Sequence, residues 1–463
     1  MELTLKEYLS GLKGQRVAVV GIGVSNTPLI KLLVRAGVKV TACDKRTREQ
    51  FDGQAAALES LGVELHLGPD YLDGLRNYSV IFRTPGLRPD VPQLLDAVEH
   101  GAVLTSEMEV FFQTCPCRII AVTGSDGKTT TTSIIAGLLE KAGYNTYVGG
   151  NIGRPLLADA EGMSPEDMAV VELSSFQLMT MDRSADIAVV TNLAPNHLDV
   201  HTSMEEYVTA KQNIYRHQNA GGLVVLNHDN DITRGFAADA VGEVTFFSRR
   251  ERLEKGVFVE DGAIWVSDDN GIRKVLPLLD ILLPGDHNVE NYMAAIGAVN
   301  GLVPDEVIRA FASSFQGVEH RIELVRTLRD VRYYNDSIAS SPSRTIAGLR
   351  CFPEKVILIA GGYDKHIPFD TLGPEIVEHV KKLFLTGATA AKIRAAVEAS
   401  PNYAPGAPEI VEIDDFRETV LAAHKAAEPG DVVILSPAGA AFDKFKNFME
   451  RGAFFKEIVN GLE

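Results

Sequence analysis

Short apolar runs that end in glycine or a polar residue recur along the chain, and segments with helical periodicity separate them. Near the N-terminus such runs predict strands at residues 16–23, 39–44 and 79–82, and residues 28–36 predict the helix that follows the first strand. Strands that alternate with helices favour a parallel sheet covered by helices on both faces. We therefore predict an α/β fold for this part of the chain.

The first strand ends in a glycine turn of the kind that approaches nucleotides. Gly21 and Gly23 follow this strand, and Asp44 ends the next strand about 20 residues later. This pattern is typical of a Rossmann-type half, which binds its ligand at the carboxyl ends of the strands. Asn26 stands where the third glycine of the fingerprint belongs, so tight packing without a ligand stays open as an alternative.

Residues 119–132, which read IIAVTGSDGKTTTT, are the most informative stretch of the sequence. An apolar run leads into a glycine-rich loop, and apolar residues at helical spacing follow Lys128. A loop at the start of a helix presents N–H groups to an anion, Lys128 can reach terminal phosphates, and the Thr129 hydroxyl can bind magnesium. Val122 occupies the position of the first glycine in the usual nucleotide loop, so an ordinary turn before a helix is the alternative.

The remaining pattern divides the chain into three domains. Further strands are predicted at 168–173, 187–192 and 222–227, an antiparallel appendage with a hairpin at 243–267, and a helix at 287–300. A second hairpin, formed by 321–326 and 331–336, opens a third α/β unit. Because 463 residues are too many for one core, we predict domains at 1–107, 108–317 and 318–463. A final helix is predicted to carry an aromatic core stripe made of Phe442, Phe445, Phe448 and Met449.

Composition narrows the functional classes. Apolar residues make up 45% of the chain and charged residues 23%, as in ordinary globular proteins, and no apolar run reaches the roughly 18 residues of a membrane span. The N-terminus lacks a signal-peptide pattern, and the net charge of −17 argues against a general affinity for nucleic acid or for anionic membranes. Four scattered cysteines form no disulfide framework, and no Cys or His lies near Cys115 and Cys117 in the sequence to complete a zinc site. We expect reduced thiols and a cytoplasmic protein.

Polar residues at predicted strand ends add to the nucleotide loop. Glu172 ends one strand, His197 follows another, and Lys211 lies in a predicted helix. Together with Thr129, Glu172 and His197 supply ligands that magnesium accepts beside phosphates, where charge neutralisation does much of the work of phosphoryl transfer. Each of these residues also has a reading without any function. Glu172 could be a solvated residue at a strand end, His197 a hydrogen-bonded loop histidine, and Lys211 an exposed helix lysine.

An ordered set of motifs resembles the Mur ligase family, the ATP-dependent amino-acid ligases of peptidoglycan precursor synthesis. The set comprises GIGVSN, TPGL, GSDGKTTT, GGNIG, ELSSFQ, TNLAPNHLDVH, YVTAKQNIY, LPGDHNVENYMAA, EHRIE, NDSIASSP, GGYDKHIPF and LSPAGAAFDKFKNFMERG, and it spans essentially the whole chain. The resemblance implies a Rossmann-like N-terminal domain, a P-loop ATPase-like central domain and a Rossmann-like C-terminal α/β domain. It also implies a cytoplasmic enzyme of cell wall biogenesis, with roles in cell shape and cell division, and we expect a monomer.

The activity that the resemblance implies is ligation of D-glutamate to UDP-N-acetylmuramoyl-L-alanine. ATP would activate the substrate carboxylate as an acyl phosphate, giving ADP and phosphate, with Mg²⁺, expected as two ions, as cofactor. By the same resemblance the catalytic residues are Lys128, Glu172, His197 and Lys211, and the metal ligands are Thr129, Glu172, His197 and a carbamylated Lys211. Since a carbamate forms on a neutral amine, the site has to lower the pKa of Lys211 by desolvation or nearby positive charge.

The resemblance assigns the other site residues to three groups. Those for ATP are Gly124, Ser125, Asp126, Gly127, Lys128, Thr129, Thr130, Asn291, Arg321 and Asp336. Those for the UDP substrate are Ser25, Asp44, Lys45, Arg46, Gly86 and Asn151, and those for the incoming amino acid are Ser340, Lys365, Phe442 and Phe448. Ile338 and Ala441 stand where family members often have lysine and serine, and Arg344 can supply the positive charge that Ile338 lacks.

Alternatives from other classes remain at this stage. A sister ligase would add L-alanine, a diamino acid or a dipeptide, although the sequence has no D-N-P-R-type motif of the diaminopimelate enzymes. Folylpolyglutamate synthetase shares the ATP-binding and C-terminal domains but lacks the UDP-binding domain. A dehydrogenase would explain the glycine turn and Asp44 but not Lys128 and Thr129, and a non-catalytic nucleotide switch would leave Lys211 unexplained.

Overall fold

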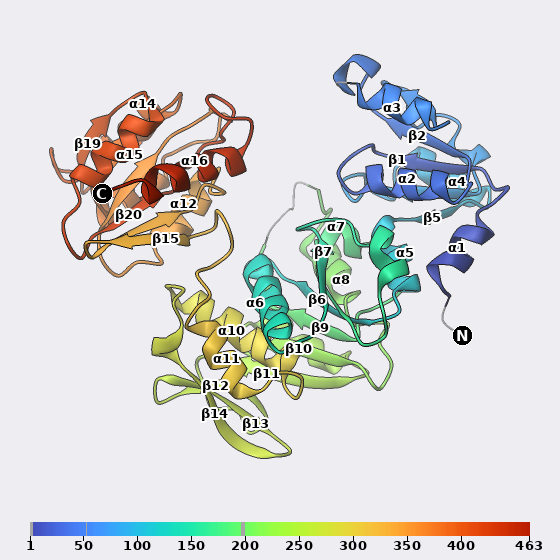
Figure 1. Ribbon diagram of the computed structural model, residues 1–463, viewed down its shortest axis with the longest axis horizontal. Helices are drawn as coiled ribbons and strands as arrows, with labels where there is room; N and C mark the ends of the chain where they lie inside the picture. The colour runs from blue at the N-terminus through green and yellow to red at the C-terminus, as the bar shows by residue number, and fades with distance from the viewer. Residues whose placement is uncertain (1–2, 52, 196–199) are drawn as a thin grey trace. The chain divides into compact units, whose positions relative to one another are not determined.

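The computed structural model describes residues 3–51, 53–195 and 200–463. These residues form two compact units, the first made of Met1–Leu278 with Val289–Phe311 and the second of Leu279–Asn288 with Ala312–Glu463. The first unit contains two sheets and the second contains one (Figure 1). Each sheet is built mainly from parallel strands with helices between them, which confirms the predicted α/β fold.

The N-terminal sheet has five parallel strands in the order β3-β2-β1-β4-β5. Its strands are β1 (Val17–Val20), β2 (Val40–Asp44), β3 (Glu64–Leu67), β4 (Val80–Arg83) and β5 (Val103–Thr105), and its helices are α1 (Leu5–Gly11), α2 (Asn26–Arg35), α3 (Gln54–Ser60) and α4 (Pro92–Glu99). Along β1, Val17 and Val19 pack into one apolar cluster while Ala18 and Val20 pack into another, so both faces of the sheet are covered. The strand order reverses at β1, and ligands of such sheets bind outside the carboxyl ends of the strands at this point.

The central sheet has nine strands in the order β14-β13-β12-β11-β10-β9-β6-β8-β7. Its strands are β6 (Arg118–Thr123), β7 (Thr146–Gly150), β8 (Met168–Glu172), β9 (Ile187–Val190), β10 (Leu223–Asn227), β11 (Glu243–Ser248), β12 (Gly256–Glu260), β13 (Ala263–Asp268) and β14 (Gly271–Pro277). The helices of this region are α5 (Glu107–Thr114), α6 (Lys128–Lys141), α7 (Ser175–Leu178), α8 (Met204–Gln212), α9 (Asp231–Gly235), α10 (Asp286–Val299) and α11 (Asp305–Ala312). Strand β6, which leads into the nucleotide loop, lies in the interior of the sheet between β8 and β9.

The predicted antiparallel appendage is a continuation of this central sheet. Strands β12 and β13 form the expected hairpin, and its turn residues Asp261 and Gly262 both have positive φ, as a two-residue hairpin turn requires. However, β11 pairs in parallel with β10 and with β12, so the segment extends the main sheet by hydrogen bonds (Figure 1). The predicted hairpin is therefore confirmed, but β11, the first strand of the predicted antiparallel segment, pairs in parallel, because alternation along a strand does not reveal the direction of its partner.

The C-terminal sheet has six strands in the order β15-β16-β20-β17-β18-β19. Its strands are β15 (Glu323–Leu328), β16 (Val331–Asn335), β17 (Val356–Ala360), β18 (Val380–Leu385), β19 (Glu409–Glu412) and β20 (Val432–Leu435), and its helices are α12 (Pro342–Leu349), α13 (Leu372–His379), α14 (Ala390–Glu398), α15 (Phe416–Lys425) and α16 (Phe448–Asn460). Strands β15 and β16 form the predicted antiparallel hairpin, and the other pairings are parallel. Leu358 packs into the cluster on one face and Ile357 and Ile359 into the cluster on the other.

The predicted aromatic stripe of the final helix is wrong in part. Helix α16 begins only at Phe448, because the Asn447 side chain caps it by accepting a hydrogen bond from the Glu450 N–H. Phe442 therefore lies before the helix and is 61% exposed, and Met449 is 51% exposed. Within the described ranges, none of the helices is both long enough and apolar enough to cross a bilayer.

Candidate active site

The nucleotide loop joins the end of β6 to the start of α6. Gly124 and Gly127 have φ values of 152° and 78°, which other residues rarely adopt. A Cβ atom on Gly124 would lie 2.0 Å from Thr191 Oγ1, and one on Gly127 would lie 2.4 Å from Asn291 Oδ1. Val122, which replaces the first glycine of the usual motif, is a buried strand residue of β6. The loop therefore needs glycine at two positions and tolerates valine at the third.

Hydrogen bonds from the segment after β9 hold the loop in place. The Ser125 N–H donates to the Asn192 carbonyl at 2.9 Å, and the Asp126 N–H donates to Asn192 Oδ1 at 2.9 Å. Ser125 Oγ lies 3.0 Å from the Ala194 carbonyl oxygen, to which it donates, and 2.9 Å from the Tyr207 hydroxyl. The start of α6 thus presents a preformed loop with helix-terminal N–H groups, a ready anion site.

Two lysine side chains reach this loop from different helices. Lys128 Nζ, at the start of α6, donates to the carbonyl oxygens of Gly124 and Ser125 at 2.9 and 2.8 Å. Lys211 Nζ, in the last turn of α8, donates to Thr123 Oγ1 and to the Gly124 carbonyl, both at 3.0 Å. Lys211 is only 2% exposed. Burial, and then the positive charge of Lys128, lower the pKa of Lys211 well below its usual value.

Glu172 forms an oxygen-rich cluster at the end of β8. The residue is 1% exposed, and its carboxylate accepts hydrogen bonds from Thr129 Oγ1 at 2.7 Å and from Asn151 Nδ2 at 2.8 Å. The backbone of Asn151 also donates to the Glu172 carbonyl at 2.8 Å. A buried carboxylate beside a hydroxyl is a donor set that suits Mg²⁺, which prefers oxygen ligands. His197, the further predicted ligand, lies outside the described residues.

Other predicted ATP residues of the first unit surround the same loop. Asn291 lies in α10, and its Oδ1 accepts a hydrogen bond from Thr131 Oγ1 at 3.2 Å. Thr130 is buried in the first turn of α6. The structure therefore brings Asn151, Glu172, Lys211 and Asn291, which are far apart in the sequence, to the loop that carries Lys128 and Thr129.

The predicted UDP residues of the N-terminal sheet gather at its carboxyl edge. Asp44 ends β2, Ser25 directly precedes α2, and Gly86 follows β4. Asp44 Oδ2 accepts from the Ile22 N–H at 2.7 Å, and its carboxylate pairs with Arg46 at 3.0 Å. Burial alone would raise the pKa of Asp44, but hydrogen bonds from Arg46 and Ile22 lower it.

Asn26 explains why this fingerprint lacks its third glycine. The side chain is buried, and its Nδ2 donates to the carbonyl oxygens of Val20 and Gly21 at 3.1 and 2.9 Å. Asn26 therefore fixes the glycine turn to the start of α2 through its side chain. Lys45, another residue predicted to bind the UDP substrate, is exposed to solvent.

Asp336, one of the predicted residues of the second unit, directly follows β16. Asp336 is fully buried and accepts a hydrogen bond from Ser436 Oγ at 2.7 Å, and burial raises its pKa to about 7. The positive charge of Arg321 acts on the same carboxyl group. Lys365 and Phe442 are exposed, whereas Ser340 and Phe448 are half-buried.

The two departures from the family pattern lie in the same unit. Ala441 is buried, and the Ile338 carbonyl accepts a hydrogen bond from the Arg344 guanidinium at 3.2 Å. Arg344 therefore does place a positive charge beside Ile338.

Sequence reasoning missed Arg451, which organises this part of the second unit. Its buried guanidinium donates to the Ser337 carbonyl at 2.8 Å and to the carbonyl oxygens of Gly439 and Ala440 at 3.1 Å each. Burial lowers the pKa of Arg451 to about 10. A single arginine in a helix gives no sequence signal for this role, because its partners lie in two remote loops.

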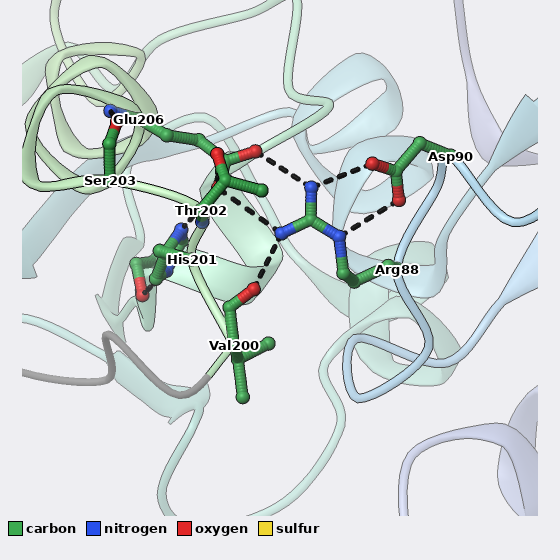
Figure 2. Close-up of polar contacts among 8 residues, drawn as sticks. Arg88, Asp90, Val200, His201, Thr202, Ser203 and Glu206 are labelled. Atoms are coloured by element: carbon green, nitrogen blue, oxygen red, sulfur yellow. Dashed lines mark hydrogen bonds and ion pairs between the residues drawn. The ribbon is translucent and has the colours of Figure 1, made fainter.

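Sequence reasoning also missed Arg88, which connects the N-terminal sheet to the helix of Lys211. Figure 2 shows the Arg88 guanidinium between the carboxylates of Asp90 and Glu206, with the Val200 carbonyl as a further acceptor. Its Nη2 lies 2.7 Å from Asp90 Oδ2 and 2.8 Å from Glu206 Oε1, and its Nη1 lies 2.6 Å from the Val200 oxygen. The hydrogen bond from Arg88 is the main cause that lowers the pKa of Glu206 to about 2.

Three family models match the chain in order. They are the Mur ligase MurD-like N-terminal domain at residues 15–106, the Mur ligase middle domain at 122–299, and the Mur ligase glutamate ligase domain at 320–439. The UDP-N-acetylmuramoylalanine--D-glutamate ligases of Acetivibrio thermocellus and Ruminiclostridium cellulolyticum are 52% and 51% identical to the chain, and each match covers 100% of both sequences.

Solved structures share the fold at lower identity. A UDP-N-acetylmuramate-alanine ligase from Thermotoga maritima has a TM-score of 0.58 and 18% identity, over 96% of this chain and 99% of that one. A pseudomurein peptide ligase type C from Methanothermus fervidus has a TM-score of 0.54 and 17% identity, over 97% and 100%. These matches confirm the predicted three-domain α/β architecture. With relatives this similar along its whole length, the chain belongs to the Mur ligase family.

Proposed function

We propose that the protein joins D-glutamate to UDP-N-acetylmuramoyl-L-alanine in an ATP-dependent reaction of peptidoglycan precursor synthesis. The observation that carries this proposal is the 52% identity, over the whole chain, to a ligase named for this reaction. The nucleotide loop and the cluster around Glu172 supply the chemistry that such a ligase needs. No observation favours a sister ligase or a folylpolyglutamate synthetase.

The proposed reaction has two steps. A carboxylate oxygen of the UDP substrate forms a bond to the γ-phosphorus of ATP, the bond to the β–γ bridging oxygen breaks, and ADP leaves. The amine of D-glutamate then attacks the acyl carbon and loses a proton, and the carbon–oxygen bond to phosphate breaks, so the products are an amide and phosphate.

The residues of the nucleotide loop stabilise the negative charge of the phosphoryl group that is transferred. Lys128 and the N–H groups at the start of α6 bind the phosphates and stabilise the negative charge that builds up during transfer. In the structure Lys128 Nζ is held by two loop carbonyls, at 2.9 and 2.8 Å, so its ammonium group already lies at the loop before a phosphate arrives.

Thr129 and Glu172 are the described residues that would hold magnesium. Their oxygens lie 2.7 Å apart, and the Glu172 carboxylate is buried with hydrogen-bond donors from uncharged groups on both of its oxygens. When bound, Mg²⁺ neutralises phosphate charge. Asn151 orients the Glu172 carboxylate through its amide N–H, and His197 stays a predicted further ligand.

Lys211 is the proposed site of a carbamate. Its buried amine has a lowered pKa, and the neutral form can attack carbon dioxide, forming a nitrogen–carbon bond and releasing one proton. The product would place a carboxylate-like group next to the loop in place of a cation. Support comes from burial, from the nearby charge of Lys128 and from the motif around Lys211.

The resemblance to the family also assigns residues to the two substrates and to ATP. The N-terminal residues Ser25, Asp44, Lys45, Arg46 and Gly86 would bind the UDP moiety, and Ser340, Lys365, Phe442 and Phe448 would bind D-glutamate. Arg321 and Asp336 would contact ATP. We also propose a cytoplasmic monomer with domains at 1–107, 108–317 and 318–463.

The proposal is tested by measuring phosphate release and amide product with single amino acids. Reactions contain ATP, magnesium, UDP-N-acetylmuramoyl-L-alanine and one of D-glutamate, L-glutamate, L-alanine or a diamino acid. We expect coupled product formation with D-glutamate and background rates with the others. Comparable turnover with another amino acid, and none with D-glutamate, would overturn the proposal.

A further inference from the structure

Three sulfur atoms meet at the start of β6, away from the nucleotide loop. Cys115 directly follows α5, Cys117 directly precedes β6, and Met163 directly follows the 3₁₀ helix Leu157–Gly162. The two Sγ atoms lie 3.4 Å apart, and each lies 4.0 Å from the Met163 sulfur. The fold thus brings a third sulfur, from 46 residues further along the chain, to a cysteine pair that looks isolated in the sequence.

The spacing of these atoms matches three ligands around one ion. Three sulfur atoms at about 2.3 Å from a shared ion, the metal–thiolate distance of zinc sites, would lie about 4 Å apart in a trigonal arrangement. Pro116 stands between the cysteines and fixes its own φ, which restricts the loop that carries both thiols. Small side-chain adjustments would therefore bring all three sulfurs to one ion.

The surroundings of the cluster favour a cation with soft ligands. Cys117 and Met163 are 5% and 7% exposed and belong to the apolar core, while Cys115 is half-buried at its edge.

The ligand set argues against zinc. Zinc sites use four ligands from Cys, His and carboxylates. Over residues 3–51, 53–195 and 200–463, no His, Asp, Glu or further Cys ligand atom joins the two thiols in a group within 4.8 Å. Two thiolates and a thioether instead select soft ions such as Cu(I).

We propose that Cys115, Cys117 and Met163 form a binding site for one thiophilic cation of the Cu(I) class. Binding forms two metal–thiolate bonds and one metal–thioether contact, and the two thiol protons leave to solvent. The ion links the end of α5, the start of β6 and the segment after the 3₁₀ helix. Because the nucleotide loop follows the opposite end of β6, the site is separate from the proposed active site.

The test is anaerobic titration of the reduced full-length protein with Cu(I) against a Cu(I) chelator, followed by X-ray absorption at the copper edge. We expect one ion per chain with three sulfur neighbours. Met163→Leu keeps the volume of the side chain, so the fold should persist, and it should leave two sulfur neighbours and weaken binding by about tenfold or more. Cys115→Ser with Cys117→Ser should abolish binding.

The matched control replaces the two cysteines outside the cluster. Cys43→Ala with Cys351→Ala should bind one ion as tightly as the wild type, since both thiols lie elsewhere in the fold. The proposal is overturned if the wild type does not bind stoichiometrically, if the double serine variant binds equally well, or if Met163→Leu retains the wild-type affinity and coordination number. Displacement of Cu(I) by an equal concentration of Zn²⁺ would also contradict it.

Discussion

Lys128 and Lys211 donate hydrogen bonds to the same acceptor, the carbonyl oxygen of Gly124, at 2.9 and 3.0 Å. The two ammonium groups come from different helices and differ in environment, because Lys211 is buried under the loop and Lys128 is only partly buried. Burial and the charge of Lys128 both lower the pKa of Lys211. One lysine is thereby suited to bind phosphate as a cation, and the other to react as a neutral amine.

We predict that Lys211 carries a carbamate in the active enzyme. Lys211→Ala should be nearly inactive, and a small carboxylate such as acetate or formate should restore part of the activity by occupying the vacated space. In the wild type, ¹³C-labelled bicarbonate should give a carbamate signal in the carbon NMR spectrum that Lys211→Ala lacks. Full activity after removal of carbon dioxide, together with no labelled signal, would contradict the prediction.

Lys128→Ala should lower kcat by roughly 10²-fold or more, because a contact that strengthens as charge builds on the transferring phosphoryl group is lost. Steady-state phosphate release measures the effect, and circular dichroism checks the fold. Lys141→Ala, at the other end of the same helix, is the matched control and should keep near-normal turnover. Equal rates for the two variants would mean that the loop is not the ATP site.

Arg88→Ala should lower kcat by about tenfold or more, although Arg88 lies outside the nucleotide loop. Its guanidinium holds Glu206 and Val200, and α8 carries Lys211 five residues beyond Glu206, so loss of the guanidinium should misplace the helix. Arg88→Lys should restore little, because lysine cannot form the two-pronged contact. Arg48→Ala, which removes the exposed Arg48–Glu59 pair, is the control and should have no effect on kcat.

The ion pair between Arg88 and Glu206 should make the stability of the folded protein depend on pH in the acid range. The pKa of Glu206 is lowered to about 2, so the stability it contributes is present above the unfolded-state pKa of about 4.5 and is lost as pH falls toward 2. Thermal unfolding at pH 7 should show Glu206→Gln less stable than the wild type by about 1 kcal/mol. The difference should shrink steadily as pH falls from about 5 toward 2, and a constant difference would refute the assignment.

Asp336 should show the opposite dependence on pH. Burial raises its pKa to about 7, so the carboxyl group destabilises the fold increasingly as pH rises from the unfolded-state value near 4 toward 7. Asp336→Asn should therefore gain stability relative to the wild type over this range, by up to about 4 kcal/mol, while the KM for ATP rises. Calorimetry at pH 5 and pH 8 measures the first effect. An unchanged KM for ATP would show that Asp336 does not contact ATP.

The strands and the nucleotide loop could be predicted because their signals are local. Each signal consists of residues that are neighbours in the sequence. These signals are the apolar runs, the glycines of the loop, the Lys–Thr pair after it and the hairpin turn at Asp261-Gly262. The start of α16 was misplaced because spacing alone ignores the cap: Asn447 satisfies a free N–H group and begins the helix at Phe448. Likewise, Asn26 replaces a glycine through side-chain hydrogen bonds that no fingerprint contains.

The sequence by itself determined the order of the elements, the family resemblance and the residue types available for phosphate chemistry. Only the tertiary structure decided which of them meet. Residues far apart in the chain meet in three places: Lys211 is buried beside Lys128, Arg88 pairs with Glu206, and Met163 approaches two cysteines. Hydrogen bonding, charge and burial act over a few ångströms of space, so pairings across strands and helices are set by packing and leave no periodic trace in the sequence.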